Sequence, residues 1–215
     1  MEQEDKMAYK VIVLNGSPKA RGCTATALDE IIRTLREEGI ETELIQIGNK
    51  EIRGCTACRY CSSHDGCVFD DIVNETAAKF ETADGLVIGS PVYYGSPNGT
   101  VLAFMDRLFY STGFSKQMKV GAAVVSCRRG GNTASFDVLN KYFTISGMPV
   151  VSSTYWNQVH GFTADDVKKD LEGLQTMRNL ARNMAFLIRA IHAEKEKNGL
   201  PLQEHEAFTS FPDGK

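Results

Sequence analysis

The stretch Tyr9-Lys-Val-Ile-Val-Leu-Asn-Gly-Ser-Pro-Lys-Ala-Arg-Gly-Cys-Thr24 decides the fold of this 215-residue chain. It opens with a short apolar run, Tyr9–Leu14, whose β-branched residues predict a buried strand. A glycine-bearing loop follows, and apolar residues then recur at helical spacing: Leu28, Ile31, Ile32 and Leu35. A buried strand joined by a tight loop to an amphipathic helix begins a βαβ unit, so we expect a parallel sheet.

The same alternation of strand and helix patterns continues along the chain. Four further strands are predicted at Thr42–Ile47, Leu86–Ile88, Val120–Val125 and Pro149–Tyr155. Helical spacing follows three of them, through Val73, Ala77 and Phe80, through Val101, Phe104, Met105 and Leu108, and through Leu139, Tyr142 and Phe143. A long last helix is expected to begin at the capping-box pattern Thr163–Asp166, with a buried face of Val167, Leu171, Leu174, Ala181, Met184 and Ile188.

The polarity of the predicted strands indicates their order in the sheet. The first, third and fourth strands are almost wholly apolar and belong inside the sheet, whereas the second and fifth carry polar positions and belong at its edges. This pattern agrees with an α/β, three-layer flavodoxin-like fold with a five-stranded parallel sheet of order 2-1-3-4-5. We expect one domain over residues 1–198, with a cysteine loop inserted at 53–68, and a polar C-terminal tail over 199–215.

Composition narrows the classes of function. The net charge is −3 and no basic block occurs, which argues against a nucleic-acid partner. The sequence shows no signal-peptide pattern and no run of 18 apolar residues, so we expect a soluble, cytoplasmic protein without membrane contact. Cysteines in that compartment are more often metal-binding or catalytic than structural disulfides.

Four of the six cysteines lie within 13 residues, as Cys55-Thr-Ala-Cys58-Arg-Tyr-Cys61-Ser-Ser-His-Asp-Gly-Cys67. Cysteines so close together in a local loop rarely reach disulfide geometry. A C-x2-C-x2-C run with a fourth cysteine nearby is close to the spacing that ligates an iron–sulfur cluster. Zinc sites usually come as two separated pairs, so the spacing favours iron–sulfur; zinc and free thiols remain the alternatives.

A ligand in this fold binds at the switch point between the first and third strands. The loop after the first strand leads directly into a helix, whose N-terminus favours a phosphate. The candidate phosphate contacts are Ser17, Lys19, Arg21, Gly22, Cys23 and Thr24. The Walker A spacing and the G-x-G-x-x-G fingerprint are both absent from this loop, and a connection without a ligand is the alternative.

Two further loops complete the predicted site. The loop after the third strand contains Pro91, Val92, Tyr93, Tyr94 and Gly95, whose aromatics can line a planar ring or, alternatively, cover the edge of the core. The loop after the fourth strand contains Ser126, Arg128, Gly130 and Gly131. Positive charge there would lie near a ring that becomes anionic on reduction; exposed arginines without a ligand are equally compatible with this loop.

Together these loops resemble the NADPH-dependent FMN reductase family of the flavodoxin-like superfamily. The resemblance lies in the Gly16-Ser-Pro18…Gly22-x-Thr24 opening, Pro91-Val-Tyr-Tyr94, the Asp106-Arg107 pair and Gly130-Gly131, over roughly 10–159. The compact loop of Cys55, Cys58, Cys61 and Cys67 makes the iron–sulfur flavoprotein branch the most similar.

The resemblance implies FMN bound noncovalently, with its phosphate on the first loop and its ring between the other two. It also implies a [4Fe–4S] cluster on the four cysteines, NAD(P)H as a candidate electron donor, and a homodimer or homotetramer. Electrons would pass to a redox partner protein or a small-molecule acceptor. Hydride transfer to flavin requires no acid–base residue, and we assign no catalytic side chain.

We therefore expect an FMN-dependent oxidoreductase, with three alternatives. The first is a cluster-free NAD(P)H-dependent FMN or quinone reductase on the same fold. The second is an electron carrier without a substrate pocket of its own. The third is a binding or structural module whose cysteine loop holds zinc.

Overall fold

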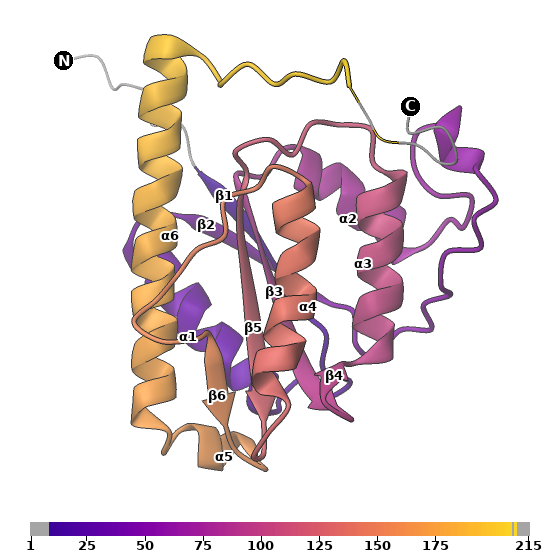
Figure 1. The fold of residues 1–215 in the computed structure, drawn as a ribbon. Helices are drawn as coiled ribbons and strands as arrows, with labels where there is room; N and C mark the ends of the chain where they lie inside the picture. The colour runs from indigo at the N-terminus through magenta and orange to yellow at the C-terminus, as the bar shows by residue number, and fades with distance from the viewer. Residues whose placement is uncertain (1–8, 208, 210–215) are drawn as a thin grey trace.

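The computed structural model describes residues 9–207 and 209 of the chain. Its central sheet contains five parallel strands in the order β2-β1-β3-β5-β6 (Figure 1). The strands are β1 (Lys10–Asn15), β2 (Glu41–Gln46), β3 (Gly85–Tyr93), β5 (Val120–Cys127) and β6 (Gln158–His160). A two-residue strand, β4 (Ser96–Pro97), pairs antiparallel with the end of β3. Because β4 lies off the parallel path, the predicted order of five strands is confirmed.

Burial follows the predicted placement of the strands. Every residue of β5 is buried, as are five of the six residues of β1, whereas β2 is mostly exposed or half-buried. Interior strands of a parallel sheet are covered on both faces and therefore need continuous apolar runs, while edge strands tolerate polar residues. The polarity of the second strand thus correctly predicts one edge of the sheet, and the other edge is β6, which lies outside the stretch predicted as the fifth strand.

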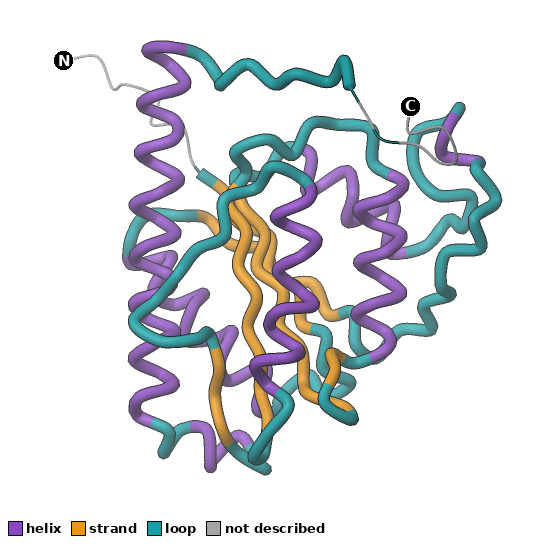
Figure 2. Tube along the Cα trace, in the orientation of Figure 1, coloured by secondary structure: helices purple, strands orange, loops and turns teal. Residues whose placement is uncertain are grey.

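Helices cover both faces of the sheet (Figures 1 and 2). One face carries α1 (Cys23–Glu37), the short α5 (Ala164–Val167) and α6 (Leu171–Asn198). The other carries α2 (Ile72–Glu81), α3 (Gly99–Ser111) and α4 (Asn132–Ile145). A 3-10 turn, η1 (Tyr60–Ser62), lies in the cysteine loop. None of the helices in the described part of the chain is long and apolar enough to cross a membrane.

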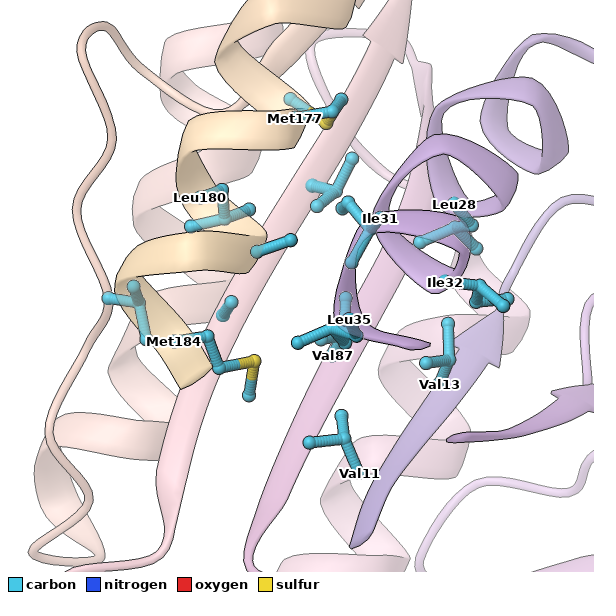
Figure 3. Close-up of a cluster of buried hydrophobic side chains, with 14 of the residues drawn as sticks. Val11, Val13, Leu28, Ile31, Ile32, Leu35, Val87, Met177, Leu180 and Met184 are labelled. Carbon is cyan, nitrogen blue, oxygen red and sulfur yellow. The ribbon is translucent and has the colours of Figure 1, made fainter. Parts of the chain in front are cut away.

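Alternate residues of each strand supply two hydrophobic cores. Val11, Val13 and Val87 pack with α1 and α6 in the core shown in Figure 3. Ile12 and Leu14, between and beyond those valines, join the core under α2, α3 and α4. This alternation is the period of two that a strand imposes on its side chains.

The predicted fifth strand is wrong in position. In the stretch 149–155 only Val150 forms a bridge, to Gly121, and the regular strand lies at Gln158–His160. The polar residues of the stretch bond to α6 instead: Ser153 Oγ donates to the Thr176 carbonyl at 2.7 Å, and the Ser152 carbonyl accepts from Asn183 Nδ2 at 2.9 Å. These contacts hold the stretch beside α6, and regular pairing with β5 begins only at Gln158.

The predicted last helix is two helices. The capping box of Thr163 and Asp166 is confirmed, but it opens the one-turn helix α5. Asp170 then caps α6, accepting a hydrogen bond from the Gly173 amide at 2.9 Å. Leu171 lies at the start of this new helix and is 74% exposed, so its predicted burial is wrong.

The strand β5 contains a glycine, Gly121, that its packing against α4 requires. A Cβ at Gly121 would lie 2.5 Å from Phe143 Cγ, and Phe143 is fully buried. We predict that Gly121→Ala lowers the free energy of unfolding by about 1–3 kcal/mol through overpacking, measured by urea denaturation. Adding Phe143→Leu should recover part of that loss. Gly99→Ala is the control, because nothing lies within 4 Å of a Cβ there; equal stabilities of the two alanine variants would contradict the packing.

Candidate cofactor sites

A cleft of about 420 Å³ lies at the carboxyl ends of the parallel strands. That volume falls within the roughly 300–1,000 Å³ typical of small-molecule sites. It is lined by the loops after β1, β3, β5 and β6: Ser17, Pro18, Lys19, Arg21, Gly22, Cys23, Thr24, Pro91, Val92, Tyr93, Ser126, Cys127, Arg128, Gly161, Phe162, Thr163 and Ala164. The structure therefore brings the three predicted loops to one cleft.

The N-terminus of α1 opens into this cleft without a side-chain cap. Its N-cap residue is Gly22, and none of the described side chains caps it. The first turn of α1 also contains no acidic residue. The leading amides of a helix have no partner within the helix and carry the positive end of its dipole. This end of α1 can therefore bind an anion through its backbone, with Lys19 and Arg21 beside it.

The loop before α1 is fixed by a small polar network. Asn15 Oδ1 accepts from the Ser17 amide at 3.0 Å, and Asn15 Nδ2 donates to Gln46 Oε1 at 2.7 Å. Gln46 Nε2 in turn donates to the Ser17 carbonyl at 2.6 Å. Ser17 Oγ accepts from the Lys19 amide at 3.2 Å, which leaves the hydroxyl proton free for a ligand. The edge strand β2 thus helps to shape the predicted phosphate loop.

Two of the predicted loops are joined across the floor of the cleft. Thr24 Oγ1 and Ser126 Oγ share a hydrogen bond of 2.8 Å, and both side chains are buried. Tyr93 lines the cleft and is 48% exposed, so its side chain is accessible to a ligand. The Arg128 guanidinium lies over the Phe162 ring at 5.6 Å. The cleft therefore combines hydroxyls, an aromatic wall and a positive charge.

Four of the predicted residues do not line the cleft. Tyr94 is fully exposed and has a left-handed φ of 52°. Gly131 precedes α4 with a φ of 85°, and a Cβ there would lie 2.7 Å from the Gly95 Cα. Gly95 and Gly131 therefore allow the turn after β3 to pack against the turn after β5. Gly130 likewise lies outside the cleft lining, and its place is in the supporting turn.

The fourth wall of the cleft was not predicted from the sequence. Gly161–Ala164 follows β6, and the Gly161 carbonyl accepts a weak hydrogen bond from Cys23 Sγ at 3.5 Å. The capping box at Thr163 marked a helix start there, but the misplaced fifth strand put that start away from the site. Burial raises the pKa of both the Cys23 and Cys127 thiols, so they line the cleft as neutral groups and not as nucleophiles.

The four clustered cysteines line a second, separate cavity. Cys55, Cys58, Cys61 and Cys67 lie around a space of about 20 Å³ between their loop and the end of α3. Within residues 9–207 and 209, no three or more His, Cys, Asp or Glu side chains are arranged to hold a single metal ion. The donor set of four thiols fits an iron–sulfur cluster, but a space near the size of one water requires the loop to widen.

The backbone of the cysteine loop is unusual beside the second cysteine. Ala57 and Arg59, on either side of Cys58, have left-handed φ values of 53° and 60°. Non-glycine residues rarely adopt this conformation, and it is frequent at functional loops. His64 is exposed and stacks on Tyr60 with ring centroids 4.0 Å apart, in agreement with its interpretation as a loop residue.

One buried arginine of α3 holds both ends of this loop. The Arg107 guanidinium pairs with Asp71 at 2.7 and 3.0 Å, at the end of the loop. It also donates to the Arg53 carbonyl at 3.3 Å, at the start of the loop, and to the Phe69 carbonyl at 3.1 Å. Its Nε donates to Cys67 Sγ at 3.2 Å. Arg107, the second residue of the Asp106-Arg107 pair, therefore anchors the cysteine loop.

Comparison with solved structures agrees with the fold. RosB aligns with a TM-score of 0.68 at 16% identity, covering 95% of this chain and 94% of that one. An NAD(P)H:quinone oxidoreductase from Methanothermobacter marburgensis aligns with a TM-score of 0.63 at 18% identity, covering 82% and 97%. At these identities the likeness concerns the architecture alone.

Relatives found by sequence are more similar to this chain than these structures are, and they identify its family. An iron–sulfur flavoprotein of Methanocaldococcus jannaschii is 35% identical over 190 residues, or 85% of this chain and 98% of the relative. An iron–sulfur flavoprotein of Methanosarcina thermophila is 30% identical over 192 residues, or 87% and 100%. Residues 9–163 match the family described as NADPH-dependent FMN reductase, which confirms the resemblance seen in the sequence. The chain belongs to the NADPH-dependent FMN reductase family and is an FMN-containing oxidoreductase.

Proposed function

We propose that this oxidoreductase uses two redox groups, FMN in the cleft and a [4Fe–4S] cluster on Cys55, Cys58, Cys61 and Cys67. Electrons would move between a reduced donor and an acceptor through these groups. The observation that carries the proposal is the convergence of all four clustered cysteines on one cavity. The names of the relatives as iron–sulfur flavoproteins support the same chemistry.

The cleft residues would form two groups, one that binds the phosphate of FMN and one that orients its ring. The uncapped start of α1, with Ser17, Lys19, Arg21 and Thr24, would hold the phosphate dianion. Pro91, Val92 and Tyr93 would orient the ring, with Ser126 and Arg128 at its pyrimidine side. FMN supplies the hydride and electron chemistry, and the positive charge of Arg128 would favour the anionic reduced ring.

The cysteine loop would hold the cluster in a setting of positive charge. Four thiolates around a cluster leave it net negative, and Arg107 donates directly to Cys67 Sγ. Arg53 lies over the Phe69 ring at 5.1 Å, on the same loop. Nearby cations of this kind raise the reduction potential of a cluster.

A second candidate is a cluster-free NAD(P)H-dependent FMN or quinone reductase. The narrow cysteine cavity favours it, because about 20 Å³ admits no cluster until the loop widens. The FMN cleft would then be the entire active site, and the four cysteines would be reduced thiols.

The separation of the two cavities supports assembly of more than one chain. Val92 and Tyr93 of the cleft pair with β4, just before α3 begins, whereas the cysteine cavity is lined by the last turns of α3. The 13 residues of this helix span about 20 Å. Figure 1 shows the cleft end of the strands and the purple cysteine loop on different sides of the molecule. A homodimer or homotetramer would bring the cluster of one copy to the FMN of another, with a redox protein or small molecule as the final acceptor.

Ser17 offers a specific test of the phosphate site. We predict that Ser17→Ala weakens FMN binding about 10- to 100-fold, because a hydrogen bond to a charged group contributes roughly 1.5–3 kcal/mol. Riboflavin lacks the phosphate, so its affinity should be unchanged. Flavin fluorescence titration of the apoprotein measures both. Equal losses for the two ligands would show that Ser17 shapes the cleft and does not contact the phosphate.

Iron content tests the second group. Anaerobically isolated protein should contain about four iron atoms per chain and absorb beyond the flavin bands. Cys58→Ser should lose most of that iron while retaining FMN, because it removes a ligand outside the cleft. Cys127→Ser is the matched control, since Cys127 lines the cleft, and it should keep its iron. Flavin without iron in the wild-type protein would favour the cluster-free reductase, and zinc in the loop would rule out the cluster.

A further inference from the structure

The last turns of α3 present two polar side chains to the cysteine cavity. Arg107 and Ser111 are four residues apart, which places them on the same face of the helix. Both line the cavity with the four cysteines. Both are also buried, with exposed fractions of 1% and 5%. The wall of the cavity opposite the loop is therefore apolar helix with two polar groups set into it.

The guanidinium of Arg107 cannot turn away from this cavity. Its two terminal nitrogens are held by the Asp71 carboxylate and by the carbonyls of Arg53 and Phe69. The remaining donor, Nε, is thereby directed at Cys67 Sγ, at 3.2 Å. A planar fork fixed at two corners has its third direction fixed as well.

The hydroxyl of Ser111 has no hydrogen-bond partner in the described part of the chain. Buried hydroxyls are nearly always paired, so this one calls for an explanation. A serine or threonine in a helix commonly donates to the carbonyl four residues before it. The next residue, Thr112, does so, donating to the Leu108 carbonyl at 2.7 Å. Ser111 does not, and its hydroxyl remains free beside the cavity.

We propose that Arg107 and Ser111 are outer donors for the inorganic centre, hydrogen-bonding to its sulfur atoms and raising its reduction potential. This inference rests on the proposed cluster. Reduction adds negative charge that is shared by the iron and sulfur atoms, so a donor to sulfur stabilises the reduced form more than the oxidised form. Ser111 gains the partner that it lacks without the cluster. Both residues act through the cluster and its ligands, so they are tuning and positioning residues.

The test is the midpoint potential of the cluster in the holoprotein. Ser111→Ala should keep its full iron content and show a lower cluster midpoint in an anaerobic potentiometric titration followed by electron paramagnetic resonance. The FMN midpoints, followed by visible absorbance, should not move. Arg107→Lys is the second variant: it keeps the positive charge but loses the Nε donor, and its cluster midpoint should also fall.

The chain offers a matched control for the lost hydroxyl. Thr76 on α2 is fully buried and its hydroxyl is also unpaired, but it does not line the cysteine cavity. Thr76→Val should therefore leave the cluster midpoint unchanged. If Ser111→Ala and Arg107→Lys both keep the wild-type cluster midpoint with full iron, the tuning role is overturned and the cluster assignment stands. If the wild-type protein takes up no iron, the cluster assignment fails, and the tuning role fails with it.

Discussion

The parallel register of β1, β3 and β5 is the constraint on which the cleft depends. β1 ends its pairing with β3 at Asn15 opposite Gly89. β3 continues beyond that point, and its pairing with β5 ends at Pro91 opposite Ser126. The overhang of β3 therefore carries Val92 and Tyr93 beyond the end of β1, to the cleft that the loop leading into α1 also lines. A one-residue slip would turn these side chains to the other face of the sheet.

Close backbone approach maintains this arrangement at the turn after β1. A Cβ at Gly16 would lie 2.0 Å from Val101 Cγ2 and 2.7 Å from the Gly89 carbonyl oxygen. The Gly16 amide instead donates to that carbonyl at 2.8 Å. The turn is thus bonded to β3 and packed on α3 at once, which is why the loop that opens α1 keeps one shape.

Local sequence patterns predicted the elements whose burial does not depend on which other element covers them. Apolar runs identify buried strands whatever covers them, so the interior strands, the edge at β2 and the order of the sheet could be predicted from the sequence. The segment 149–155 was misassigned because its polar residues bond to α6, a partner far along the chain that periodicity does not reveal. Gly95 and Gly131, which were predicted to contact a ligand, pack against each other in a turn–turn contact that periodicity does not reveal either. The wall at Gly161–Ala164 depends on where β6 lies and was missed with it.

The helix α3 connects the cleft and the cysteine loop through different residues at its two ends. At its start, Asn98 Oδ1 accepts from the Thr100 amide at 2.8 Å, while the Asn98 amide donates to Ser90 Oγ at 3.1 Å. At its end, Arg107 holds the cysteine loop. The apolar face between them is fully buried against the sheet, which fixes the position of one end relative to the other.

The cleft and the cysteine loop are therefore shaped by different residues. The cleft depends on strand register and on glycines at the turns, neither of which involves residues 53–71. The cysteine loop depends on one guanidinium and on the final turn of α3, and most of its other residues are exposed. Changes in the loop can therefore alter its chemistry without moving the cleft, provided that Arg107 keeps Asp71 and the two carbonyls. The same separation means that widening of the loop, which the proposed cluster needs, would leave the sheet in place.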